Sequence, residues 1–209
     1  MADAKLDGLD AAAFNFLVSL VSYCQRGLVV GIDRLLKGYF NDCFHSLRLS
    51  VECACIAYKG ACDPDLIPVW LDSIEGEEEY RASQKVFAKR FSGNEDAMAG
   101  LKLVYDECST YSHASPFAVG SFADYTGDRI HVRYFDRQTE RDLNSVSSTM
   151  AAGHMFILSV LFLVFSEFMS TNRRMIFLAG LVKLASVPSG KVPSDLEQLR
   201  NKVITTMVQ

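Results

Sequence analysis

The stretch from Ala151 to Met169 constrains the fold more than any other part of this sequence. It is apolar on all sides of a helix, and its run from Met155 to Ser166 contains neither a charged residue nor a histidine. A membrane-spanning helix needs about 20 predominantly apolar residues, whereas His154 and Glu167 bound a shorter run here. We therefore expect a central helix that other helices bury, with a membrane span as the alternative.

Helical spacing dominates the rest of the chain. In the helix predicted for 29–58, apolar residues recur three and four positions apart and so share one face; they are Leu36, Phe40, Phe44, Leu47, Val51, Ala54 and Tyr58. Further helices are predicted for 9–24, 64–74, 77–91, 95–113, 140–170 and 173–186. The predicted fold class is all-α, a helical bundle of about six to eight helices.

The hydrophobic period changes between Phe117 and Phe135. Two arms flank the turn residues 126–128, and the second arm, from Ile130 to Tyr134, has the β-branched and aromatic residues of a strand. A lone hairpin is marginally stable unless it packs on other elements. We therefore expect a small β-hairpin insertion near 117–135 that covers the bundle as a flap.

Two signals near the end of the sequence define the expected domains. The stretch 187–190 has the Pro, Ser and Gly residues of a linker, and Ser194 and Glu197 then form a capping box that starts an amphipathic helix. We expect a single helical-bundle domain with the hairpin flap over 1–190, and a C-terminal amphipathic helix over 191–209.

Charge and cysteine usage limit the function classes. With 21 Lys and Arg against 25 Asp and Glu in 209 residues, the net charge is −4. This charge balance excludes nonspecific binding of duplex nucleic acid through the net charge of the protein, but it does not exclude a local basic pocket. Residues 1–10 lack the pattern of a signal peptide, so we expect a cytoplasmic protein whose six cysteines stay reduced. Cys53 and Cys55 would point apart on a helix, and we expect neither a metal site nor a cofactor.

One polar face interrupts the apolar helix predicted for 29–58. It consists of Asn41, His45, Arg48 and Glu52, spaced four, three and four residues apart. Arg48 and Glu52 form an i,i+4 pair, which we expect to be largely buried and hydrogen-bonded because most of the helix is apolar. The face is either structural, as a salt bridge or an exposed stripe, or part of a functional site.

A second polar face lies on the helix predicted for 95–113. Tyr105, Ser109 and His113 are spaced four and four residues apart. At a helix C-terminus, His113 is either a general acid or base, since its ordinary pKa lies near working pH, or a cap on the last carbonyl groups. The economical arrangement packs the two helices side by side, with both polar faces in a shared cleft.

Two segments together resemble a known group of proteins. The first runs from Arg48 to Glu52 and is followed by Pro64 and Trp70; the second runs from Tyr105 to His113 and is followed by Ser115. In these segments the chain is similar to uncharacterised bacterial families grouped near the HEPN (higher eukaryotes and prokaryotes nucleotide-binding) superfamily. The resemblance covers roughly 29–117 and implies a small helical bundle.

The resemblance also implies an activity. HEPN members that cut RNA use an Arg and a His separated by four to six intervening residues, without a metal, at a dimer interface. This chain departs from the motif, because those positions before His113 hold Asp106, Glu107 and Cys108. Arg48 would therefore have to supply the arginine from another helix.

We therefore expect an RNA- or nucleotide-directed site in a homodimeric protein that does not bind a membrane. The expected catalytic residues are His113, Arg48 and Glu52, and the expected substrate-binding residues are Tyr105, Ser109, His45 and Asn41. The alternatives are a non-catalytic helical dimerisation or interaction module and a small-ligand-binding protein.

Overall fold

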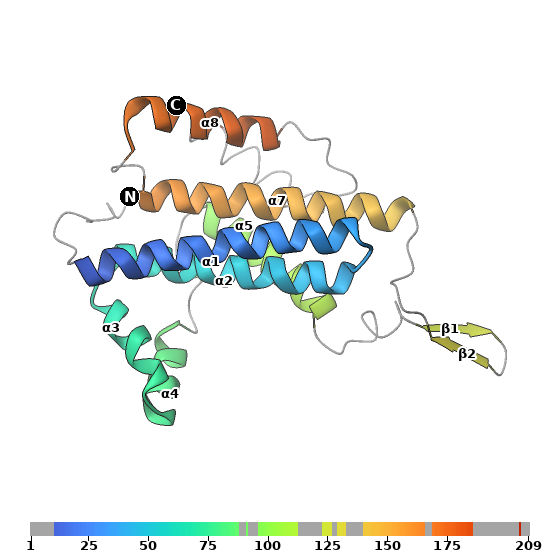
Figure 1. Cartoon of the computed structure of the whole chain (residues 1–209), viewed down its shortest axis with the longest axis horizontal. Helices are drawn as coiled ribbons and strands as arrows, with labels where there is room; N and C mark the ends of the chain where they lie inside the picture. Colours follow the sequence, from blue (N-terminus) through green and yellow to red (C-terminus); the bar gives the residue numbers. More distant parts are fainter. Residues whose placement is uncertain are drawn as a thin grey trace.

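The computed structural model describes residues 11–87, 91, 96–112, 123–126, 129–132, 140–165, 169–185 and 205. Four long helices lie alongside one another and alternate in direction (Figure 1): α1 (Ala11–Leu36), α2 (Phe40–Cys62), α5 (Asp96–Ser112) and α7 (Glu140–Phe165). A fifth, α8 (Thr171–Ala185), packs on the outer side of α7. The all-α bundle predicted from the sequence is confirmed.

Short helices close one end of the bundle. α3 (Leu66–Leu71) continues into a 3₁₀ turn (Asp72–Ile74), and α4 (Glu77–Phe87) follows. Three glutamates occupy the first turn of α4 and Lys85 its last turn, the arrangement that the helix macrodipole favours. The Lys59 ammonium, near the end of α2, donates a hydrogen bond to the Val86 carbonyl (2.9 Å) and so links α2 to α4.

The core of the bundle is built around α7. Its middle is fully buried at Met155, Phe156, Ile157, Val160 and Val164, and these side chains belong to the core that α1, α2 and α5 share. Among the described helices, α1 and α7 are both long and apolar enough to span a membrane, by length and composition only. The apolar segment of α7 is 67% buried and that of α1 only 33%. The place of 155–165 in the core is as predicted, and cytoplasmic location stays a prediction.

The boundary between the first two helices differs from the prediction. The residues from Val29 to Leu36 belong to α1, and α2 begins only at Phe40. Between them Gly38 has a φ of 82°, and the Tyr39 and Gly38 amides donate to the Arg34 (2.9 Å) and Leu35 (3.0 Å) carbonyls. This is the glycine-dependent Schellman end of a helix, so the chain reverses where the apolar spacing had suggested continuity.

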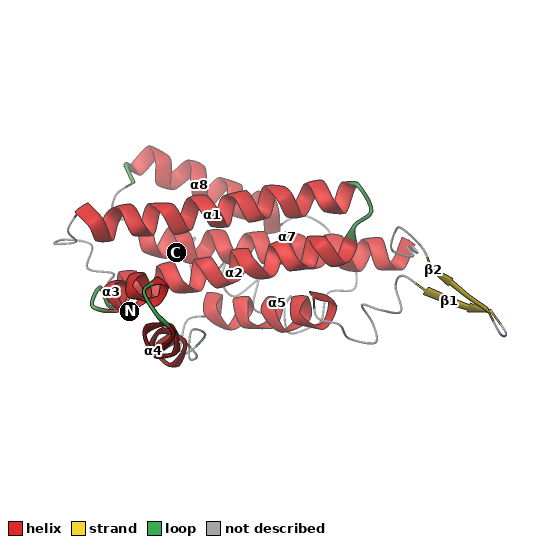
Figure 2. Cartoon of the chain, turned by 60° about the horizontal axis from the view of Figure 1, so that its bottom comes forward, coloured by secondary structure: helices red, strands yellow, loops and turns green. Residues whose placement is uncertain are grey.

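Two short strands lie within the predicted hairpin region. β1 (Ala123–Thr126) and β2 (Arg129–Val132) pair antiparallel, with Ala123 opposite Val132 and Thr126 opposite Arg129. Figures 1 and 2 show them beyond the end of the bundle that lies opposite α3 and α4. The covering role that the sequence suggested for this hairpin stays a prediction.

Candidate functional site

Arg48 links the two predicted polar faces. Its Nη2 donates a hydrogen bond to the Tyr105 hydroxyl on α5 (2.7 Å), and its Nε lies 3.5 Å from Glu52 Oε1 on its own helix. The guanidinium carbon also lies 4.8 Å from the centroid of the Tyr105 ring, within the range of a cation–π contact. The structure thus places Arg48, Glu52 and Tyr105 in one group, which we call the Arg48 cluster.

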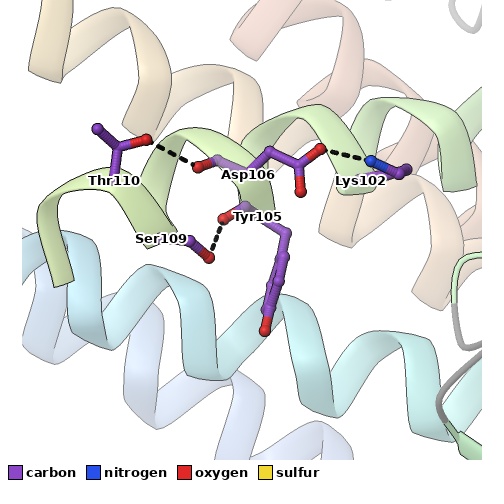
Figure 3. Close-up of polar contacts among 5 residues, drawn as sticks. All are labelled: Lys102, Tyr105, Asp106, Ser109 and Thr110. Atoms are coloured by element: carbon purple, nitrogen blue, oxygen red, sulfur yellow. Dashed lines mark hydrogen bonds and ion pairs between the residues drawn. The ribbon is translucent and has the colours of Figure 1, made fainter. Parts of the chain in front are cut away.

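Tyr105 is oriented by α5 and by one further aromatic ring. In Figure 3 its ring points from α5 toward α2, whereas Lys102, Asp106 and Thr110 lie along another side of the same helix. Lys102 pairs with Asp106, so that side of α5 carries a charge pair of its own. The Phe91 ring lies 5.1 Å from the Tyr105 ring and is tilted by 51°, a favourable aromatic geometry.

The close packing of three helices sets the level at which Arg48 meets Tyr105. Gly153 on α7 lies against Leu47 and Val104, the residues next to Arg48 and Tyr105 in the sequence. A Cβ at Gly153 would lie 2.8 Å from Leu47 Cδ1 and 3.2 Å from Val104 Cγ1. A side chain at this position would require Leu47 and Val104 to move, so Gly153 lets α7 pack closely against α2 and α5 next to the cluster.

The Arg48 cluster is largely buried, as the sequence predicts. The side chains of Arg48 and Glu52 retain only 20% and 26% of their accessible surface, and Arg48 Nε is shielded from solvent. The hydrogen bond to Tyr105 is part-buried as well. The surface that remains exposed leaves part of the pair within reach of a ligand.

The other predicted site residues contribute less. The Ser109 hydroxyl donates to the Tyr105 carbonyl within α5 (2.7 Å), so this contact is local. On α2, His45 is exposed and Asn41 is half-buried. His113 lies outside the described residues, and so do 117–122, 127–128 and 133–135 of the predicted hairpin region and most of the predicted C-terminal helix 191–209.

Most of the cysteines are buried in the core of the bundle. All six carry free thiols, and burial raises the pKa of Cys24, Cys43 and Cys53 to about 12, 12 and 11. These thiols therefore stay neutral near pH 7 and behave as small apolar side chains. In the described part of the chain, no three His, Cys, Asp or Glu side chains are arranged to hold a metal ion.

Sequence reasoning missed two residues of this region. Phe91 was expected only as the last residue of a helix, and nothing in its sequence context indicates contact with Tyr105. Gly153 had a usable signal, because a glycine inside a long helical pattern often marks a close approach between helices.

Comparisons with other proteins identify no family for this chain. No protein-family profile matches the chain, and no match is found among curated proteins or solved structures.

Proposed function

We propose that the Arg48 cluster is the centre of an RNA- or nucleotide-directed site of the HEPN type, as the sequence resemblance implies. The observation that carries this proposal is the orientation of the Arg48 guanidinium by partners on two helices, Glu52 and Tyr105, at an accessible edge. A planar, permanently charged guanidinium suits phosphate oxygens. Pre-orientation by Glu52 and Tyr105 reduces the entropy that binding would otherwise cost.

The proposal assigns the remaining residues as follows. Glu52 orients Arg48, Tyr105 and Ser109 position the substrate, and His45 and Asn41 extend the same face of α2 toward it. His113, next in sequence after the last residue of α5, acts as general acid or base without a metal. The proposal includes a cytoplasmic homodimer and a β-hairpin inserted between α5 and α7.

Binding to a single-stranded RNA oligonucleotide and to a nucleoside triphosphate tests the proposal. Arg48→Gln should weaken binding about ten-fold, since a hydrogen bond to a charged group contributes about 1.5–3 kcal/mol, and should lower the salt dependence by about one phosphate contact. The matched control is Arg81→Gln, which removes an exposed arginine that also pairs with a glutamate four positions away. Equal losses in both variants, or no binding by the wild type, would reject the proposal.

RNA degradation in the presence of a chelator tests the catalytic part separately. Wild type should cut the oligonucleotide without a metal, and His113→Ala should abolish cleavage while leaving binding within about three-fold. Cleavage that survives in His113→Ala would remove this histidine from the mechanism.

A non-catalytic interaction module is the second candidate, and one observation favours it. α1 exposes apolar side chains along its outer side, including Val29 (61%), Ile32 and Leu36 (82%). Exposed apolar surface of this kind often marks a protein interface, and a second copy of the chain is the expected partner. Sedimentation of wild type and an Ile32→Glu variant distinguishes a dimer formed through this side from a monomer.

A further inference from the structure

A second feature lies on the other side of Glu52, between α1, α2 and α3. It is an open pocket of about 400 Å³, within the range of small-molecule sites, roughly 300–1,000 Å³. Phe16, Leu20 and Tyr23 of α1 line one wall, and Leu49 and Ile56 of α2 line another. Trp70 of α3 closes the end. Three helices thus contribute to a largely apolar site that the proposed function does not use.

The aromatic side chains give this pocket a preformed shape. The Phe16 and Trp70 rings lie 4.9 Å apart, tilted by 51°, and Phe16 and Leu20 are buried against the core. Tyr23 is half-exposed at the rim. Rings of this kind bind flat or aliphatic ligand bodies, and their faces also attract cations.

The polar groups of the wall select the charge of the ligand. The Ser19 hydroxyl donates to the Asn15 carbonyl (2.8 Å) and so serves its own helix. The Cys53 thiol is neutral, because burial and the nearby Glu52 charge raise its pKa to about 11. Glu52 is the charged side chain among the lining residues. A carboxylate has lone pairs for several donors, so Glu52 can accept from a ligand while it pairs with Arg48.

We propose that this pocket binds a small amphiphilic amine, with the apolar body between Phe16, Leu20 and Trp70 and the protonated amine at Glu52. The carboxylate supplies the complementary charge for the ammonium group, and the rings contact the apolar body. An anionic ligand of the same shape lacks this partner at Glu52 and should bind more weakly. The pocket and the RNA-directed site share Glu52 but use different faces of the cluster, so Arg48 variants test the second site and the ligand series tests the first.

The chain carries its own reporter for this site. Trp70 is the single tryptophan of the sequence, so tryptophan fluorescence reports on the pocket alone. Titration with phenylbutylamine, phenylbutanol and phenylbutyrate compares a cation, a neutral donor and an anion of matched shape. The amine should give a saturable change in Trp70 fluorescence, at concentrations at least about ten-fold below those needed for the butyrate, a difference of about 1.4 kcal/mol.

Charge-removing variants then test the role of Glu52. Glu52→Gln keeps the shape of the side chain and should weaken phenylbutylamine about ten-fold, leaving phenylbutanol within about two-fold. Asp33→Asn is the matched control, because it removes one exposed carboxylate of α1 that pairs with Lys37 and does not line the pocket. It should change the affinity for neither phenylbutylamine nor phenylbutanol. The wild-type ligand series decides the question even if Glu52→Gln does not fold.

Three outcomes would overturn the proposal: no saturable response to the amine, an equal or stronger response to the butyrate, or unchanged amine affinity in a folded Glu52→Gln variant. Loss of RNA binding in Arg48→Gln with intact amine binding leaves this proposal standing, so the two proposals fail separately.

Discussion

The polar face of α2 has two halves that look alike in sequence and differ in structure. Asn41 and His45 form one half, with His45 exposed to solvent. Arg48 and Glu52 form the other, and Arg48 reaches across to Tyr105 on α5. The spacing along the helix is the same in both halves. The contact of Arg48 with a neighbouring helix is what singles out this half as the candidate site.

The largest change in stability is expected from a cavity in the core between α5 and α7. Phe156 is fully buried on α7, and its ring lies against Gly100 of α5. Phe156→Ala should lower the free energy of unfolding by about 3–5 kcal/mol through cavity formation, measured by chemical denaturation. Phe14→Ala, at a ring that is 39% exposed on α1, is the control and should cost less than about 1 kcal/mol.

A smaller effect is expected where the helix spacing beneath Arg48 is changed. Gly153→Ala should cost about 1–3 kcal/mol, because the added methyl group overlaps Leu47 and pushes α2 and α5 apart. The same substitution at Gly180 of α8, which has no atom within 4 Å of the added Cβ, should instead stabilise the protein by about 0.5–1 kcal/mol. If both substitutions changed the free energy of unfolding in the same direction, that result would contradict the close approach at Gly153.

The two halves of the polar face should also differ directly in stability. Glu52→Ala removes the ion-pair partner of a partly buried arginine and should cost about 1 kcal/mol. His45→Ala, on the exposed half, should stay within about 0.5 kcal/mol of wild type. Denaturant midpoints for both variants at one pH would show whether the two halves differ. Equal losses in the free energy of unfolding would contradict the difference.

Local signals in the sequence predict much of the fold. The charge-free run from Met155 to Ser166 can be stable only in a core or in lipid, and the structure buries residues 155–157, 160 and 164 in the bundle. The predicted ranges 64–74, 77–91 and 95–113 lie close to the observed α3 with its 3₁₀ turn, α4 and α5. Propensity, capping and periodicity all act within a few residues, so one sequence suffices for them.

The misses have a common physical cause. Leu36 and Phe40 are four residues apart and imitate one helix face across the turn at Gly38, although α1 ends at Leu36. The contact of Phe91 with Tyr105 depends on how elements distant in sequence are placed relative to one another. Only part of the candidate site was predictable, namely the residue types and their faces, because the level at which α5 meets α2 depends on tertiary packing.

The central claim is that Arg48 and Tyr105 act as one unit across α2 and α5, and a double-mutant cycle tests it most directly. Unfolding free energies of wild type, Arg48→Ala, Tyr105→Phe and the double variant give the coupling energy of the pair. The hydrogen bond and the cation–π contact predict a coupling above about 0.5 kcal/mol, whereas a His45→Ala and Tyr105→Phe cycle should be additive. Additivity in the Arg48 cycle would mean that the two polar faces are unrelated.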